Sequence, residues 1–318
     1  MKRFISALAL AAAFGAQAQD YPSKPIRMLV PFAPGGAVDT TARILAQKMD
    51  ERIGWKFVVE NRPGGNGFIA TTAVAKAPAD GYTLLMAHTG EFAVNPALFS
   101  SVPYELERDF IPITMVTDAP MLYLAHALAP FNTFQELVAQ AKAKPGSITF
   151  GSAGNGSINH LAGEWLALAA GIKLQHIPYK GGAPAAAAVA AGDVHFGVMA
   201  VPGATPHLKS GRAKVIGITT AKKSPLDQSW ATPRDAGIPD LDASIWVGLF
   251  APKGTPQAVV ERINAEVRKT MDQPEVQKRF TETGSETVGM SSADFLARIK
   301  RDAERYKRVV QQAGVKPE

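Results

Sequence analysis

The sequence predicts an α/β protein of two lobes, each a mostly parallel sheet flanked by helices, with a cleft between them. Short apolar runs alternate with amphipathic stretches along the chain, a pattern typical of parallel strands covered by helices. The length of 318 residues suits two domains of ordinary size. The middle of the chain repeats the alternation between two segments that suit chain crossovers, which predicts a second lobe inserted into the first.

The first part of the chain predicts strands and helices in alternation. Ile26–Val30 is a short apolar run, which favours a buried strand. Apolar residues then fall on one helical face between Asp39 and Ile53, and Gly54 is the expected end of that helix. Further along we expect strands at 56–60 and 82–87, and helices at 67–76 and around Asn95-Pro96.

The middle of the chain repeats this order. Strands are expected at 148–151, 176–179, 195–199 and 214–219, and helices at 134–144, 157–170 and 183–191. Two helices then close the sequence. Thr255 is the expected N-cap of the first, with Pro256 in its first turn, and the second opens with the capping-box pattern Ser291–Asp294.

Two crossover segments divide the predicted lobes. They are Asp118–Tyr123 and Thr219–Ser229. We therefore predict domain 1 at residues 21–121 plus 228–318, and domain 2 at 122–227. Two connecting strands between α/β lobes form a hinge, and a hinge creates an interdomain cleft.

The N-terminus has the three parts of a secretory signal peptide. Lys2 and Arg3 precede the apolar stretch Phe4–Phe14, and the small residues of Ala16–Ala18 follow. The apolar run is too short for a membrane anchor. We expect residues 1–18 to be removed after Ala18 and the mature protein to reside in the periplasm, where ATP- or NAD-dependent chemistry is disfavoured.

Composition narrows the functional classes. Hydrophobic residues at 46% and charged residues at 19% are ordinary for a globular protein. Without cysteine there is no thiolate nucleophile and no cysteine-ligated metal. The net charge of +6 is interspersed along the chain, which suits a small anionic ligand and is too weak for nucleic acid.

The turns that follow the predicted strands are the expected binding elements. Ligands of open α/β sheets lie at the carboxyl ends of strands, near helix N-termini. The first such turn, Pro34–Asp39, contains Gly35, Gly36 and Ala37, and its glycines expose backbone N–H groups to a carboxylate. Asp39 either caps the following helix or contacts the ligand.

The second and third turns carry polar groups. Asn66 lies in a glycine-rich segment that formally matches the dinucleotide fingerprint, but its position in the second βα unit favours a tight loop. In the third turn, Thr89 offers a hydroxyl and Gly90 a backbone N–H. Glu91 either lies in the first turn of a helix or accepts a hydrogen bond from a polar ligand.

The fourth and fifth turns belong to the second predicted lobe. The fourth contains Ser152, Asn155, Gly156 and Ser157 at the start of a helix, as the counterpart of the first turn. The fifth, Lys180-Gly181, also precedes a helix. Two facing lobes that each bring helix N-termini to one cleft would clamp an anion.

The sequence contains few patterns typical of catalytic or metal-binding sites. The sequence holds no G-x-S-x-G, Walker or H-E-x-x-H motif, and no nucleophile–base pair can be placed. His160 and Glu164 have a spacing that metal sites use, yet a lone pair of this kind is usually a packing feature. We expect no catalysis, no metal and no cofactor.

Taken together, these turns resemble the Bug family of periplasmic solute-binding proteins, which serve tripartite tricarboxylate transporters. The matching segments span the mature chain in order: Val30–Asp39 with Ala42-Arg43, Val59–Gly64, Asp80–Leu85, Asn95–Leu98, Gly151–Ser157 with His160–Glu164, Pro178–Gly181, Trp246–Pro252 and Gly254–Pro256. The resemblance implies the hinged Venus-flytrap fold, no catalysis, and a small carboxylate held by amides and hydroxyls of the turns, partly through waters.

The candidate ligand contacts can be collected from the turns and the resemblance. They are Pro34, Gly35, Gly36, Ala37, Asp39, Asn66, Thr89, Gly90, Glu91, Ser152, Asn155, Gly156, Ser157, Lys180, Gly181 and Met199. Two positions depart from the family pattern. Val38 replaces a hydroxyl residue, and Met199 stands where the family usually has an acid. Loss of that acid favours a more apolar carboxylate, whereas Glu91 would favour a polar ligand.

The expected function is capture of a small carboxylate by a monomer and its delivery to the membrane subunits of a transporter. Two alternatives stay open. The loaded protein would instead signal to a membrane sensor kinase, or the chain would be a periplasmic α/β enzyme.

Overall fold

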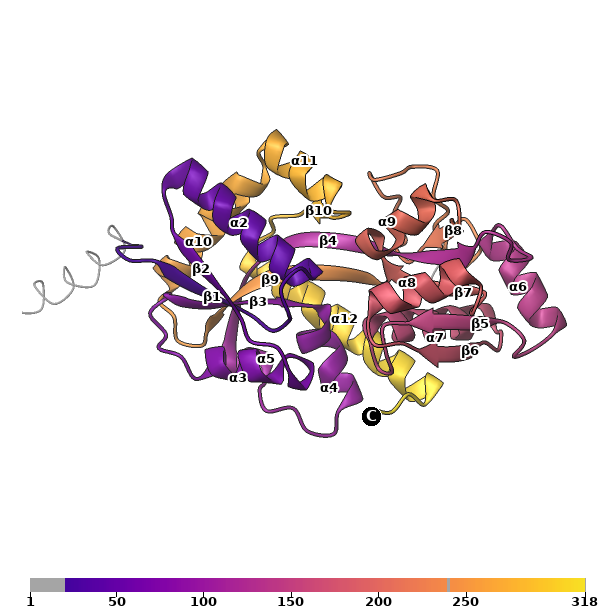
Figure 1. The fold of residues 1–318 in the computed structure, drawn as a ribbon. Coiled ribbons are helices and arrows are strands. Elements are labelled where there is room, and N and C mark those ends of the chain that lie inside the picture. Colours follow the sequence, from indigo (N-terminus) through magenta and orange to yellow (C-terminus); the bar gives the residue numbers. More distant parts are fainter. Residues whose placement is uncertain (1–20, 239–240, 318) are drawn as a thin grey trace, which may run out of the picture.

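The computed structural model describes residues 21–238 and 241–317. The predicted signal peptide at residues 1–18 lies outside this range. Two α/β lobes lie side by side, and long strands run from one into the other (Figure 1). This confirms the two-lobed α/β fold that the sequence predicts.

The first lobe is built on a five-strand segment of the sheet. Its order is β2 (Phe57–Asn61), β1 (Ile26–Val30), β3 (Thr83–His88), β9 (Ser244–Pro252) and β4 (Phe110–His126). The strands β2, β1 and β3 are parallel, whereas β9 runs antiparallel to both β3 and β4. The short β10 (Glu286–Thr287) adds to β4.

The second lobe continues the same sheet through β4. It contains β7 (Phe196–Ala200), β5 (Thr149–Ser152) and β6 (Gln175–Pro178), which are parallel, and β8 (Ala213–Ile218). β4 runs antiparallel to β7 and β8. The sheets are therefore mixed rather than mostly parallel, because β4 and β9 serve as connections between the lobes.

Helices cover the sheet in both lobes. Those of the first lobe begin at glycine-rich or polar turns, and α2 ends at Gly54, which adopts the left-handed conformation expected of a C-terminal glycine. The described helices are α2 (Ala37–Ile53), α3 (Phe68–Ala75), α4 (Asn95–Leu98), α5 (Leu106–Asp109), α6 (Phe134–Ala143), α7 (Ile158–Ala170), α8 (Gly182–Ala191), α9 (Val201–Lys209), α10 (Gln257–Met271), α11 (Pro274–Glu282) and α12 (Ser292–Ala313), with short turns η2 (Gly65–Gly67) and η3 (Gly90–Val94).

The capping predictions have mixed outcomes. The Ser291 hydroxyl accepts from the N–H of Asp294 at 3.1 Å, so the predicted start of α12 is confirmed. The prediction for Thr255 is wrong, because its hydroxyl donates to the carbonyl of Pro252 and Pro256 is the N-cap of α10. Helices α9 and α11 were not expected from the sequence.

The hinge lies where β4 changes partners. Its pairing with β9 ends at Pro120, and its pairing with β7 begins at Met121. The Thr219 hydroxyl lies beside this point, accepting from the N–H of Met121 at 3.0 Å and donating to the carbonyl of Ala243 at 2.6 Å. The Thr219 hydroxyl therefore links the point where β4 changes partners to the segment just before β9.

The return from the second lobe comes later than the sequence suggests. The carbonyl of Ala231 accepts from the N–H of Ile218, so the segment after residue 228 is still attached to β8. We propose that the chain re-enters the first lobe at Ala243-Ser244, where β9 begins, rather than at 228.

Helix α12 forms a third connection between the lobes. It packs against β4 and η3 in the first lobe and against α7 in the second (Figure 1). The rings of Trp165 on α7 and Tyr306 on α12 meet edge to face with centroids 5.9 Å apart. Aromatic pairs of this geometry contribute about 0.5–1.5 kcal/mol beyond burial. Helix α12 therefore ties the two lobes together in addition to the strands.

Candidate ligand-binding site

Three helix N-termini converge on one cavity between the lobes. This cavity, which we call the helix-end cavity, has a volume of about 600 Å³ and is lined by the first residues of α2 in one lobe and of α8 and α9 in the other. The N-cap residues of these helices are Gly36, Gly181 and Ala200, and none makes a side-chain cap within the described residues. Their first N–H groups are therefore free for an anion.

The walls of the helix-end cavity combine hydroxyls with apolar side chains. Thr40 and Thr41 contribute from α2, and Thr117 from β4. Apolar groups come from β7, the start of α9 and β9: Met199, Val201, Ile245 and Val247. Glu282 at the end of α11 lines the rim. The cavity therefore offers donors at the helix ends and an apolar surface beside them.

A second cavity opens between the same lobes. It has a volume of about 660 Å³, and we call it the His88 cavity. Asn66, His88 and Glu91 line it from the first lobe, and the turn before α7 faces them together with Lys180 from the second. Phe32, just before the first turn, and Lys180 of the fifth turn line the His88 cavity, whereas Gly35 and Gly182 line the helix-end cavity. The two cavities therefore share neighbouring segments of the chain.

Comparison with known proteins identifies the family. Residues 41–315 match the model of the tripartite tricarboxylate transporter family receptor. The protein BugT of Bordetella pertussis is 33% identical over 314 residues, covering 98% of this chain and 96% of BugT.

This chain belongs to that receptor family.

Solved receptors share its fold. The structure of Rpa4515 from R. palustris with adipate superposes with a TM-score of 0.83 at 31% identity, covering 94% of this chain and 100% of that one. The structure of MatC from Rhodopseudomonas palustris with bound malate gives 0.77 at 30% identity, covering 91% and 100%.

The predicted ligand contacts of the receptor fall into three groups: those at the helix-end cavity, those at the His88 cavity, and those at neither. Those at the helix-end cavity are Gly35, Gly36, Ala37 and Met199. Those at the His88 cavity are Asn66, Gly90, Glu91, Asn155, Gly156, Ser157 and Lys180. Pro34, Asp39, Thr89, Ser152 and Gly181 line neither cavity, although Gly182, next to Gly181, lines the first.

Asp39 shapes the first turn instead of capping the helix. Its carboxylate accepts from the N–H of Gly35 at 2.9 Å and from Asn61 Nδ2 at 2.8 Å, and it pairs with Arg43. Burial opposes ionisation, yet these hydrogen bonds, that of Arg43 the strongest, hold the pKa of Asp39 below its ordinary value. The prediction of a cap is wrong because α2 already begins at Ala37.

The Thr89 hydroxyl is used inside the first lobe. It donates to the carbonyl of Ser244 at 3.1 Å and accepts from the N–H of Trp246 at 3.0 Å. The side chain is fully buried. Thr89 therefore joins the end of β3 to β9, and its hydroxyl does not face either cavity.

Ser152 contacts a histidine that the sequence did not place near it. Its hydroxyl lies 2.7 Å from His176 Nε2, and the His176 ring stacks on His160 with centroids 3.6 Å apart. Burial, and then the neighbouring His160, lowers the pKa of His176 to about 4. Ser152 is buried and His176 is half-buried, and neither residue lines either cavity, so this contact holds the fourth turn in shape.

Several cavity residues escaped the sequence prediction. The start of α9 follows β7 just as the first turn follows β1, but Pro202 and Pro206 made a helix there difficult to predict. Ile245 and Val247 reach the cavity only because β9 returns to the first lobe beside β4. His88 could have been found as the polar residue at the end of β3.

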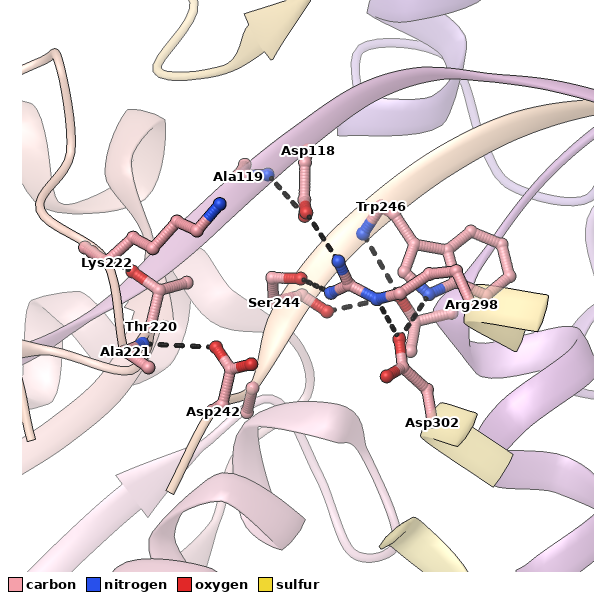
Figure 2. A network of polar contacts seen from close by, with 12 residues as sticks. Asp118, Ala119, Thr220, Ala221, Lys222, Asp242, Ser244, Trp246, Arg298 and Asp302 are labelled. Carbon is pink, nitrogen blue, oxygen red and sulfur yellow. Dashed lines mark hydrogen bonds and ion pairs between the residues drawn. The ribbon is translucent and has the colours of Figure 1, made fainter. Parts of the chain in front are cut away.

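A buried ionic network supports the receptor behind the cleft (Figure 2). Arg298 on α12 contacts Asp118 at 3.4 Å, the Ser244 hydroxyl at 2.8 Å and Asp302 at 2.6 Å. Asp302 also accepts from Trp246 Nε1 at 3.1 Å. The network joins α12 to both hinge strands, and burial raises the pKa of Asp118 even though Arg298 opposes this.

Other kinds of site are not found in the described part of the receptor. No three His, Asp or Glu side chains among the described residues gather as a metal site would require. None of the helices within 21–238 and 241–317 combines the length and apolar composition that crossing a bilayer requires.

Proposed function

We propose that this receptor captures a small carboxylate in the periplasm, closes its lobes over it, and delivers it to the membrane subunits of a tripartite tricarboxylate transporter. The observation that carries this proposal is the convergence of three uncapped helix N-termini, from both lobes, on the helix-end cavity. Each free N–H group and each helix dipole favours negative charge at that point. Two related receptors have adipate and malate bound, and both are carboxylates.

The receptor binds its ligand without transforming it. The serine–histidine contact among the predicted site residues, Ser152–His176, lines neither cavity, so it is not placed to act on a bound ligand. Neutral backbone donors stabilise a carboxylate without activating it. Family membership points the same way, since one solved relative is described as the periplasmic binding protein BugD and another, MatC, as having bound malate.

The apolar wall defines the rest of the ligand. Met199, Val201, Ile245 and Val247 offer no partner to an ammonium group, so one placed against this wall, away from the carboxylate of Glu282, would be costly to desolvate. We therefore expect a carboxylate whose carbon chain is apolar. In calorimetry, adipate should bind more tightly than 2-aminoadipate, and the opposite order would contradict this reading of Met199.

A substitution at the first helix end tests the site itself. Gly36 has ordinary backbone angles, so Gly36→Val leaves the turn unstrained while its side chain crowds the N–H groups of α2. Loss of one hydrogen bond to a carboxylate costs about 1.5–3 kcal/mol, which is roughly a 10- to 150-fold loss of affinity. Isothermal calorimetry with a panel of carboxylates measures it.

The matched control introduces the same side chain on the same helix. Gln47 is exposed on α2, away from both cavities, so Gln47→Val should leave carboxylate affinity unchanged. Equal affinities for Gly36→Val and Gln47→Val would place the carboxylate elsewhere.

A further inference from the structure

A further cavity lies on the opposite face of the hinge strands from the helix-end cavity. It has a volume of about 600 Å³, and we call it the hinge-back cavity. On β9, Ile245 and Val247 line the helix-end cavity, whereas Ser244 lines the hinge-back cavity. On β4, Thr117 lines the first and Asp118 the second. Since successive side chains of a strand point to opposite faces, β4 and β9 separate the two cavities.

Cations outnumber carboxylates in the wall of the hinge-back cavity. Among the described residues that line it, three are carboxylates and six are cations, the latter being Lys222, Lys223, Arg234, Arg298, Arg301 and Arg305. The lysines and Arg234 come from the segment after β8, and the other arginines lie on successive turns of one face of α12. Like charges gathered around one cavity repel each other, so an anion between them is stabilising.

Three of the six cations have carboxylate partners. Arg298 belongs to the ionic network described above. Arg305 Nη1 lies 3.2 Å from Asp242, and Lys223 Nζ lies 3.0 Å from Asp235. The charges of these three are therefore compensated within the protein, and the balance of the cavity depends on the other three.

Lys222, Arg234 and Arg301 are exposed, and their side chains make no hydrogen bond to any described residue. The nearest described carboxylate oxygen to Arg301 Nε belongs to Asp302, at 3.9 Å. Glu286 is the remaining carboxylate of the cavity wall. Three cations against one carboxylate leave two positive charges in excess, which suits an anion of more than one negative charge.

These three cations suit a phosphate group better than a carboxylate, because they come from separate parts of the chain. Lys222 follows β8 and extends toward β4 (Figure 2), Arg234 lies in the loop before β9, and Arg301 projects from α12. A phosphate monoester carries about two negative charges and three acceptor oxygens that point in different directions. Guanidinium groups match these oxygens in geometry as well as in charge.

We propose that the hinge-back cavity binds the phosphate group of a small soluble compound through Lys222, Arg234 and Arg301. The inference goes beyond the proposed function, because this anion is not the captured carboxylate and lies on the other face of the hinge strands. Lys222 and Arg234 belong to the segment that returns from the second lobe, whereas α12 packs against β4 and η3 in the first. A bound phosphate therefore bridges the two lobes.

Phosphate binding behind the hinge should weaken carboxylate binding in front of it. An anion that contacts both lobes draws the back of the hinge together, and the same movement widens the helix-end cavity on the other face of β4 and β9. Linkage requires the reverse effect as well, so a bound carboxylate lowers the affinity for the phosphate. This step rests on the proposed closure of the lobes, and it makes the hinge-back cavity a site that favours ligand release.

Calorimetry with inorganic pyrophosphate at constant ionic strength tests the site. The wild type should bind pyrophosphate, and Arg234→Gln and Arg301→Gln should each weaken it by about tenfold or more, because each removes a charge-assisted contact. Lys307→Gln is the matched control. Lys307 is an exposed cation of α12 outside the cavity, so its loss changes the net charge equally and should leave the affinity unchanged.

Three results would overturn the site. The first is no pyrophosphate binding by the wild type, or equal losses for Arg301→Gln and Lys307→Gln. The second is a loss in Gly36→Val but not in Arg301→Gln, which would place pyrophosphate at the helix-end cavity. The third is co-sedimentation of the wild type with phosphatidylglycerol vesicles that Arg301→Gln abolishes, which would assign the phosphate to a lipid headgroup instead of a soluble compound.

A second titration tests the coupling. It uses a pyrophosphate concentration that saturates the wild type but not Arg301→Gln. Affinity for adipate, or for whichever member of the carboxylate panel binds most tightly, should fall in the wild type and not in the variant. An equal fall in both proteins, or a fall in neither, would overturn the effect on capture. If no carboxylate binds while pyrophosphate behaves as predicted, the proposed function fails and the hinge-back site stands.

Discussion

At the scale of residues, the binding turns depend on buried polar groups that never face the cleft. Asp39 fixes the first turn through Gly35, and Ser152 fixes the fourth through His176 and the carbonyl of Gly154 at 3.0 Å. Because these turns are already fixed in place, their backbone N–H groups lose little conformational entropy when they bind a ligand. The shape of the cleft is thus set before binding.

His176 supplies a prediction about acid stability. Its pKa is lowered from 6.5 in the unfolded chain to about 4 in the folded protein. Above pH 6.5 the ring is neutral in both states and its full contribution is present. As the pH falls from 6.5 towards 4, only the unfolded chain takes up the proton, so the folded state loses stability.

Urea unfolding at a series of pH values measures this effect. The wild type should lose stability between pH 6.5 and pH 4, and His176→Gln should lose less over the same interval. His126→Gln serves as the matched histidine control. A wild-type slope that His176→Gln does not reduce would show that other groups govern the acid limb.

The sequence predicted which kinds of side chain lie at the turns better than it predicted which residues those side chains contact. The types of side chain at the turns indicated anion binding, and several of them do line a cavity. The partners of the Thr89 hydroxyl, Ser244 and Trp246, could not be predicted because they lie 155 and 157 positions away in the sequence. No local pattern reveals such a contact, since only the folded sheet brings β3 and β9 together.

At the scale of elements, α12 and the hinge strands form one buried unit. Asp302 on α12 is 4% exposed and accepts from both Arg298 and Trp246 Nε1. Removal of one partner from a buried ion pair leaves the other charge without compensation. Loss of Asp302 would leave Arg298 with Asp118 as its remaining ion-pair partner and the Trp246 indole N–H without its acceptor.

Asp302→Ala should destabilise the protein by about 3–5 kcal/mol, because Arg298 loses an ion-pair partner and the indole N–H of Trp246 loses its acceptor. Chemical denaturation followed by tryptophan fluorescence measures the change. Arg301→Ala is the control, since Arg301 is exposed and 3.9 Å from Asp302, and it should cost about 1 kcal/mol or less. Similar losses for both variants would contradict a structural role for this network.

The elements of regular periodicity could be predicted, and the connecting strands could not. β1 was placed at Ile26–Val30, as the structure has it, and α2 differs only at its start. β4 was missed because Pro112, Asp118 and Pro120 favour a loop in isolation. The strand tolerates them since it is bulged at two places along β9 and changes partners after Pro120.

At the scale of the whole molecule, the described residues form two cavities between the lobes, a crossover in β4, and a helix, α12, that packs against both lobes. The helix ends that we propose bind the carboxylate come from both lobes, so neither lobe alone completes the proposed site. Ligand affinity should require donors from both lobes at the same time. Binding is therefore coupled to how close the two lobes lie. β4, β9 and α12 constrain the movement that this coupling can use (Figure 1).

The central claim is that helix N-termini from both lobes hold one carboxylate unchanged between them. A crystal structure with the tightest-binding member of the carboxylate panel tests this most directly. We predict carboxylate oxygens within hydrogen-bond distance of N–H groups at the start of α2 on one side and of α8 or α9 on the other, with the ligand intact. A ligand that contacts a single lobe, or that lies behind β4 and β9 beside Arg298, would contradict it.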